Sequence, residues 1–157
     1  MKLLSVAIPC YNSENYMRHC IQTLLTGGPE IEILIVDDGS AKDRTAQIAD
    51  EYAARYPDIC RAIHQENGGH GEAVNTGLRN ATGTFFKVVD SDDWVKEESL
   101  HRILQVLRGF EEEGQQVDML IANYVYEKEG MENKKCIHYQ NVLPQDEIFH
   151  WSDIGHF

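Results

Sequence analysis

Two kinds of hydrophobic pattern alternate along this chain. Largely apolar runs, which are typical of strands buried in a sheet, cover residues 3–8, 30–36, 59–64, 84–89 and 117–122. Between them apolar residues recur every three or four positions, which predicts helices over residues 13–25, 72–81 and 96–110 and another that ends before Pro57. Strands that alternate with helices predict an α/β fold with a mostly parallel sheet and helices on both faces.

The pattern becomes weaker after Ala122. Residues 124–128 and 135–139 predict a β-hairpin around Gly130, and residues 144–151 predict a short helix. The chain then ends at Phe157 without a further capping element. We therefore expect residues 1–157 to form a single domain that is truncated at its carboxyl end.

Composition narrows the classes of function. The 157 residues suit one domain, and 14 Lys and Arg against 26 Asp and Glu give a formal net charge of -12. Such an acidic surface repels nucleic acid and anionic lipid, so we expect no nucleic-acid partner. The four cysteines form no C-x-x-C pair, Met1 leads almost directly into a strand without a signal peptide, and no apolar run approaches the ~18 residues of a membrane span. These features predict a cytoplasmic protein. Attachment to the inner face of the membrane would require further chain outside this sequence.

Residues that suit a ligand follow three of the predicted strands. They are Pro9 and Tyr11 after the first strand, Asp37 and Asp38 after the second, and Asp90, Ser91 and Asp92 after the fourth. Ligands of open α/β sheets bind at the carboxyl ends of the strands, so these loops are expected to meet in one cleft.

The acidic loop predicts a cation site. Asp90, Asp92 and Asp93 repel one another unless a cation lies between them, and Mg²⁺ or Mn²⁺ prefers carboxylate oxygen. We expect Asp92 to hold the metal and Asp90 to share it or to contact a ribose. The alternative is a solvated turn with a helix cap at Asp92 or Asp93.

The other two loops suit a nucleoside. A carboxylate at Asp37 or Asp38 accepts a hydrogen bond from a base edge or a ribose hydroxyl, although both residues also favour a turn before Gly39. Tyr11 either stacks on a base or packs against the protein.

A glycine-rich segment around Gly69 and His70 precedes the third predicted helix. Helix amino termini favour phosphate, and glycines let the backbone approach a diphosphate closely. His70 either donates to a phosphate or is an ordinary surface histidine. The segment lacks the third glycine of the dinucleotide fingerprint, and the chain contains no Walker A motif.

Taken together, the loops resemble those of the family 2 glycosyltransferases of the GT-A fold. The resemblance rests on residues 5–12, 35–43, 67–69, 81–83 and 90–94, in order and at the usual spacing. It implies a Rossmann-like three-layer sandwich and a nucleotide-diphosphate-sugar donor, usually a UDP-sugar. By motif match, Pro9, Tyr11 and Asp38 line the base and ribose pocket, and Asp90 and Asp92 form the "DXD" pair at the ribose, diphosphate and metal.

The resemblance also implies a reaction. The sugar passes with inversion and metal assistance to an acceptor hydroxyl on a glycan, a lipid-linked compound or another molecule, as in cell-wall or capsule assembly. Many relatives carry an Ala-Arg-Asn sequence where this chain has Ala73, Val74 and Asn75, so His70 and Lys87 are its candidate basic contacts. Relatives place the catalytic base beyond the DXD strand, and we expect it to lie outside this chain.

Two other functions remain open at this point. One is a noncatalytic fragment that binds a nucleotide sugar. The other is a nucleotidyltransferase, which the first loop disfavours because it lacks the usual glycine-rich segment with arginine or lysine. The sequence does not specify the oligomeric state.

Overall fold

The computed structural model describes residues 2–127 and 134–154. The chain divides into two compact units, residues 1–113 and 114–157, and each is described by itself. The prediction of a single domain over the whole chain stays a prediction.

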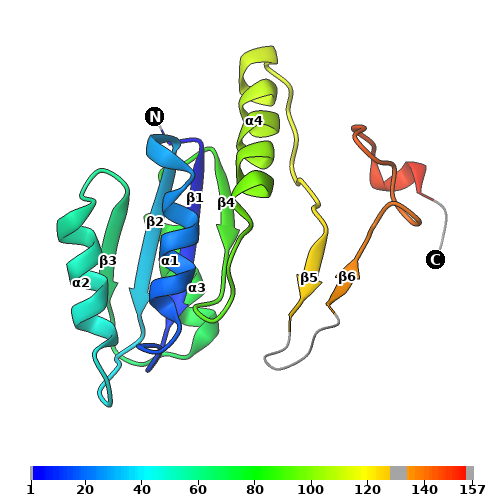
Figure 1. The fold of residues 1–157 in the computed structure, drawn as a ribbon. Coiled ribbons are helices and arrows are strands. Elements are labelled where there is room, and N and C mark those ends of the chain that lie inside the picture. Colours follow the sequence, from blue (N-terminus) through cyan, green and yellow to red (C-terminus); the bar gives the residue numbers. More distant parts are fainter. Residues whose placement is uncertain (1, 128–133, 155–157) are drawn as a thin grey trace. The chain divides into compact units, whose positions relative to one another are not determined.

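The first unit is built on a parallel sheet (Figure 1). Its strands are β1 (Leu4–Cys10), β2 (Ile31–Asp37), β3 (Cys60–His64) and β4 (Phe85–Val88), in the order β3-β2-β1-β4. Every residue of β1 and β2 is buried, as their largely apolar sequences predict for central strands. The predicted parallel sheet and the first four of the five strands predicted for it are confirmed.

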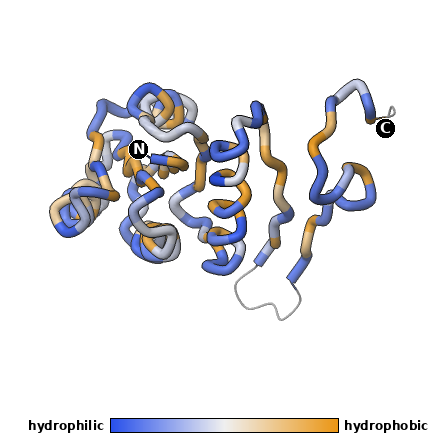
Figure 2. The backbone as a smooth tube through the Cα atoms, turned by 90° about the horizontal axis from the view of Figure 1, so that it is seen from above, coloured by the Kyte–Doolittle hydropathy of each residue, from blue (hydrophilic) through white to orange (hydrophobic). Residues whose placement is uncertain are grey.

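Helices cover both faces of this sheet. They are α1 (Met17–Leu25), α2 (Thr45–Arg55), α3 (His70–Asn80) and α4 (Glu97–Glu113), with a 3₁₀ turn at Gly28–Glu30. In Figure 1, α1 and α2 lie in front of the strands and α3 lies behind them. Figure 2 shows that the helices combine hydrophobic and hydrophilic positions, as amphipathic helices on a sheet do. The three-layer α/β arrangement is therefore confirmed.

Two local features fix α3 and the amino-terminal edge of the sheet. Helix α3 approaches β1 so closely that a Cβ atom at Gly77 would overlap the side chain of Ala7. At the start of β2, the buried carboxylate of Glu32 accepts hydrogen bonds from Ser5 Oγ at 2.7 Å and from the Thr82 N–H at 2.9 Å, and it pairs with Arg61 at 3.2 Å. The charge of Glu32 is therefore compensated by hydrogen bonds and an ion pair at the edge of the sheet where the amino ends of the strands lie.

The second unit contains a short antiparallel pair, β5 (Tyr124–Tyr126) and β6 (Lys135–Ile137). The predicted hairpin is confirmed in these strands, while its turn around Gly130 lies outside the described residues. The predicted strand 117–122 is wrong, because these residues are partly or fully exposed and pair with no strand in the part of the chain described. The predicted helix 144–151 is also wrong, since the only helical turn near it is 3₁₀ and spans Trp151–Asp153.

Across residues 2–127 and 134–154, no helix is both long and apolar enough to cross a membrane.

Candidate active site

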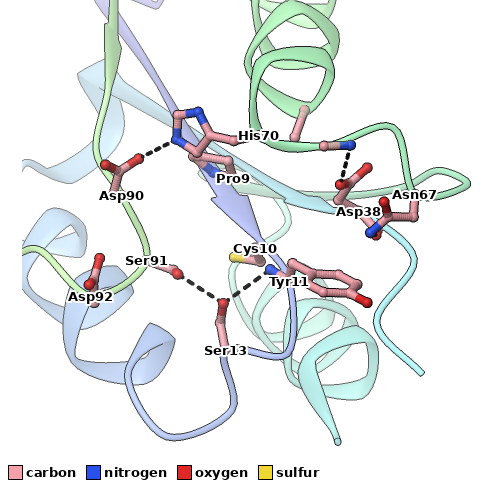
Figure 3. A pocket seen from close by; sticks show the side chains of 12 residues that line it. Pro9, Cys10, Tyr11, Ser13, Asp38, Asn67, His70, Asp90, Ser91 and Asp92 are labelled. Carbon is pink, nitrogen blue, oxygen red and sulfur yellow. Dashed lines mark hydrogen bonds and ion pairs between the residues drawn. The ribbon is translucent and has the colours of Figure 1, made fainter. Parts of the chain in front are cut away.

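A pocket of about 490 Å³ opens at the carboxyl ends of β1, β2 and β4 and at the amino end of α3 (Figure 3). This is the edge at which open α/β sheets bind ligands, and the volume lies in the range of small-molecule sites. The residues that line it are Pro9, Cys10, Tyr11, Ser13, Asp38, Asn67, Gly69, His70, Ala73, Asp90, Ser91 and Asp92. The three loops singled out in the sequence therefore meet as expected.

The predicted site residues lie around this pocket, with two exceptions. The candidate basic contact Lys87 does not line it, and neither does Asp37. Its carboxylate is buried and accepts a hydrogen bond from the Ser40 N–H at 3.1 Å, while its other oxygen lies 3.1 Å from Nδ1 of His64. Asp37 therefore anchors the turn after β2, and its neighbour Asp38 presents the carboxylate to the pocket.

Asp38 is buried and held by the glycine-rich loop. One carboxylate oxygen accepts hydrogen bonds from Gln65 Nε2 at 2.7 Å and the Gly68 N–H at 2.8 Å, and the other accepts the Gly69 N–H at 2.8 Å. Burial opposes ionisation, but these hydrogen bonds outweigh it and hold the pKa of Asp38 below its usual value. Asp38 is therefore a fixed anionic acceptor.

Tyr11 and Asn67 lie at the same end of the pocket as Asp38 (Figure 3). The Tyr11 side chain is 52% exposed, so its ring is accessible and does not serve as a core residue. The following residue, Asn12, has a positive φ of 50° and bonds through its own N–H and side chain to the loop at Ser40 and Lys42. The ring of Tyr11 is thus presented to solvent by a loop whose backbone is tied down.

The opposite end of the pocket is acidic. Asp90 and Asp92 flank Ser91 there, and Asp93 closes a turn through a 2.9 Å hydrogen bond from its N–H to the Asp90 carbonyl. Burial, followed by the charges of Asp92 and Asp90, raises the pKa of Asp93. Nε2 of His70 lies 2.7 Å from Oδ1 of Asp90, and among the described residues that line the pocket His70 has the only basic side chain.

These residues fit a hard divalent cation that also binds a substrate. In the described part of the chain, no three His, Cys, Asp or Glu side chains are placed to hold a metal by themselves. Asp90 and Asp92 can supply two carboxylates, and Mg²⁺ characteristically binds through one or two carboxylates together with substrate phosphates and water. Asp90 and Asp92 could therefore supply part of a metal's ligands, with the rest coming from a bound molecule and water.

Several polar residues of the pocket were assigned no individual role from the sequence, although Ser91 and Asn67 lie in segments singled out there. Ser13, Asn67 and Ser91 line the pocket, and the hydroxyl groups of Ser13 and Ser91 are 2.9 Å apart. Their positions between a strand and a helix were visible in the sequence, but serine and asparagine are common in any loop. Only the contacts between loops that are far apart in the sequence distinguish these residues from other polar loop residues.

Comparison with known proteins agrees with this geometry. Residues 5–152 match the sequence model of glycosyl transferase family 2. The uncharacterized glycosyltransferase EpsJ of Bacillus subtilis is 42% identical over 104 residues, which cover 66% of this chain and 30% of EpsJ. Glycosyltransferase GlyG of Streptococcus pneumoniae is 36% identical over 125 residues, which cover 78% of this chain and 39% of GlyG.

A solved structure supports the same fold. The crystal structure of Staphylococcus aureus TarS 1–349 in complex with UDP-GlcNAc matches with a TM-score of 0.61 and 32% identity, covering 71% of this chain and 32% of that chain. The parallel sheet and its flanking helices therefore form a GT-A, Rossmann-like fold. The chain belongs to glycosyl transferase family 2. It spans about a third of the length of these relatives.

Proposed function

We propose that this chain forms the donor-binding part of a glycosyltransferase that uses a nucleotide-diphosphate sugar, with UDP as the nucleotide. The observation that carries the proposal is the division of one pocket into an end with Asp38 and Tyr11 and an end with Asp90 and Asp92. A nucleoside diphosphate has the same division, since an aromatic base lies at one end and a charged diphosphate at the other.

The nucleoside end suits uracil. Asp38 is an anionic acceptor that could bind N3–H of uracil. The amino groups of cytosine and guanine could donate to it as well, so the choice of UDP rests on the similar TarS structure, which was solved with UDP-GlcNAc. The exposed ring of Tyr11 offers a face on which a base stacks, an interaction worth ~1–3 kcal/mol. Pro9 also lines the pocket, and we propose that it contacts the ribose. Asp37 is proposed to stabilise this end indirectly, because its carboxylate accepts a hydrogen bond from the Ser40 N–H in the turn after β2.

The acidic end suits a metal-bound diphosphate. Asp92 is proposed as the principal metal ligand, and Asp90 as a second ligand or a contact to the ribose. A bound Mn²⁺ or Mg²⁺ would neutralise negative charge on the departing diphosphate. His70 at the amino end of α3 is placed to donate to a phosphate oxygen, and Gly69 lets the backbone come close because its φ of +86° suits glycine.

The rest of the reaction is proposed from the family. An acceptor hydroxyl on a glycan, a lipid-linked compound or another molecule would attack the anomeric carbon from the face opposite the diphosphate, with inversion. Positioning and electrostatic stabilisation would carry most of the rate enhancement. We assign no catalytic base to this chain, so the chain alone is proposed to bind the donor and to transfer the sugar poorly or not at all.

Calorimetric titration of UDP, CDP, GDP and UDP-hexoses, each with and without Mn²⁺, tests the donor site. We expect UDP and a UDP-sugar to bind more tightly than CDP and to gain affinity from Mn²⁺. Absence of binding by a chain that circular dichroism shows to be folded would contradict the proposal. Binding without any transfer by the longer protein would favour a noncatalytic nucleotide-sugar-binding role.

The products of the longer protein distinguish transfer from nucleotidyl chemistry. Release of a nucleoside diphosphate is expected for glycosyl transfer. Release of pyrophosphate would instead identify a nucleotidyltransferase.

A further inference from the structure

Ser13 contacts both ends of the pocket. Its Oγ accepts the N–H of Tyr11 at 3.1 Å and lies 2.9 Å from Oγ of Ser91 (Figure 3). Tyr11 belongs to the proposed nucleoside end, and Ser91 separates Asp90 from Asp92 at the acidic end. A single hydroxyl group therefore joins the loop after β1 to the loop after β4.

The loop that carries Ser13 is held firmly on its other side. Ser13 is only 4% exposed, and its N–H donates to Oγ1 of Thr45, which is fully buried, at 2.7 Å. Its carbonyl accepts the N–H groups of Tyr16 and Met17 at 3.0 Å, which starts α1. Ser13 therefore has a fixed position against which Ser91 can be placed.

The acidic loop is held less firmly. The carboxylate of Asp90 is 49% exposed, Asp92 is exposed, and the two like charges favour separation when no cation is present. The other side-chain contacts of residues 90–95 are few. Asp90 has a 2.7 Å pair with His70 and a 3.6 Å contact from Cys20, and the Val95 N–H donates to Thr23 at 3.3 Å. The Trp94 ring also packs against His19, with ring centroids 5.1 Å apart. The hydroxyl pair thus links the centre of this loop directly to the Tyr11 loop.

We propose that Ser13 is a positioning residue, whose hydrogen bond to Ser91 holds Asp90 and Asp92 in place for metal-dependent binding of the diphosphate. The inference rests on the proposed donor site. Because Ser13 is fixed, the bond would hold Ser91, and with it the spacing of Asp90 and Asp92, before a cation binds. A variant without the bond would use part of the cation's binding free energy to order the loop, so it would gain less UDP affinity from Mn²⁺.

The test compares the UDP dissociation constant without Mn²⁺ to that with Mn²⁺, expressed as a ratio. It is measured for the wild type, Ser91→Ala, Ser91→Thr, Ser13→Ala and the double alanine variant. A neutral hydrogen bond of ordinary strength predicts that Ser91→Ala lowers the ratio about two- to tenfold. Ser91→Thr retains the hydroxyl group and should keep the ratio close to that of the wild type. Ser152→Ala, which removes an exposed serine outside the pocket, is the matched control and should leave it unchanged.

The double variant shows whether the two residues act as one unit. If they do, it should lower the ratio no further than Ser91→Ala does alone. A folded Ser91→Ala protein with the wild-type ratio would overturn the link while leaving the donor site intact, and so would independent, multiplying effects of the two alanines. A wild type that binds no UDP would instead remove the donor site, and the link with it. If Ser13→Ala does not fold, the Ser91→Ala and Ser91→Thr pair decides the question.

Discussion

Nε2 of His70 lies 2.7 Å from Oδ1 of Asp90 and joins the amino end of α3 to the loop after β4. The first acid of the DXD sequence therefore already has a partner within the protein. Because both side chains are substantially exposed, the contact is open to exchange with a ligand. It also places the pocket's basic side chain at the end proposed for the diphosphate.

Replacing His70 should weaken the diphosphate contact specifically. We expect His70→Ala to lower UDP affinity about five- to tenfold, because one hydrogen bond to a charged phosphate is lost from a partly exposed site. Uridine, which has no phosphate, should lose less. Calorimetry with both ligands measures the difference, and His138→Ala in the second unit is the control. Equal losses for UDP and uridine would contradict a phosphate contact.

Asp38 should determine binding of the nucleoside. In Asp38→Asn an NH₂ group replaces an oxygen that accepts from either Gly68 or Gly69, so the loop and the acceptor for the base are both disturbed. We expect uridine affinity to fall at least about tenfold, as is typical when a charged acceptor is removed. Asp58→Asn, which removes one exposed carboxylate elsewhere, should bind as the wild type does. Retained uridine binding by Asp38→Asn would exclude Asp38 from base recognition.

Glu32 predicts loss of stability in acid. Burial opposes its ionisation, yet hydrogen bonds from Ser5 and Thr82 and the nearby Arg61 hold its pKa below the usual value. A carboxyl group whose pKa is lowered by folding contributes stability above its unfolded-state pKa of about 4.3, and this contribution is lost as the pH falls through the native pKa.

Glu32→Gln tests this account. It should lower the free energy of unfolding at pH 7 by on the order of 2–4 kcal/mol, because a buried carboxylate that accepts several hydrogen bonds and pairs with the partly exposed Arg61 is lost. It should also make stability less dependent on pH between about pH 5 and pH 3. Urea unfolding across this range measures both effects. Parallel pH profiles for the variant and the wild type would show that Glu32 is not the responsible group.

Gly77 should be needed for the packing of α3. A methyl group there meets Ala7 of β1, and overpacking of this kind typically costs about 1–3 kcal/mol. Gly71→Ala is a matched control in the same helix, because no atom lies within 4 Å of the added Cβ. Chemical unfolding should therefore show Gly77→Ala destabilised and Gly71→Ala equal to or more stable than the wild type. Equal stability of the two variants would contradict the close approach of α3.

The sheet and the pocket were predictable because they depend on local signals. Largely apolar segments such as residues 31–37 are buried on both faces of the sheet, and acids at the end of a strand lie at its carboxyl edge. Asp38, Asp90 and Tyr11 were found in this way. The sequence could not show which of the adjacent acids Asp37 and Asp38 faces the pocket. That choice follows from the structure, in which Ser40 and His64 contact the Asp37 carboxylate.

The errors lie in the second unit. Residues 117–122 have the composition of a strand, but a strand needs a partner, and none pairs with them in the described chain. The Ser13–Ser91 contact joins residues 78 positions apart, and no local pattern predicts such a pair. The pairing of short apolar runs and the contacts between distant hydroxyl groups therefore cannot be predicted from local sequence, and they become visible only in the structure.

The most direct test of the central claim is the effect of Mn²⁺ on UDP binding in Asp92→Asn, measured by calorimetry beside the wild type and Asp58→Asn. The account predicts that Mn²⁺ tightens UDP binding in the wild type and in Asp58→Asn, and that Asp92→Asn loses this gain because a metal ligand is gone. A folded Asp92→Asn protein that keeps the full gain, or a wild type whose UDP affinity does not respond to Mn²⁺ or Mg²⁺, would contradict the metal–diphosphate site.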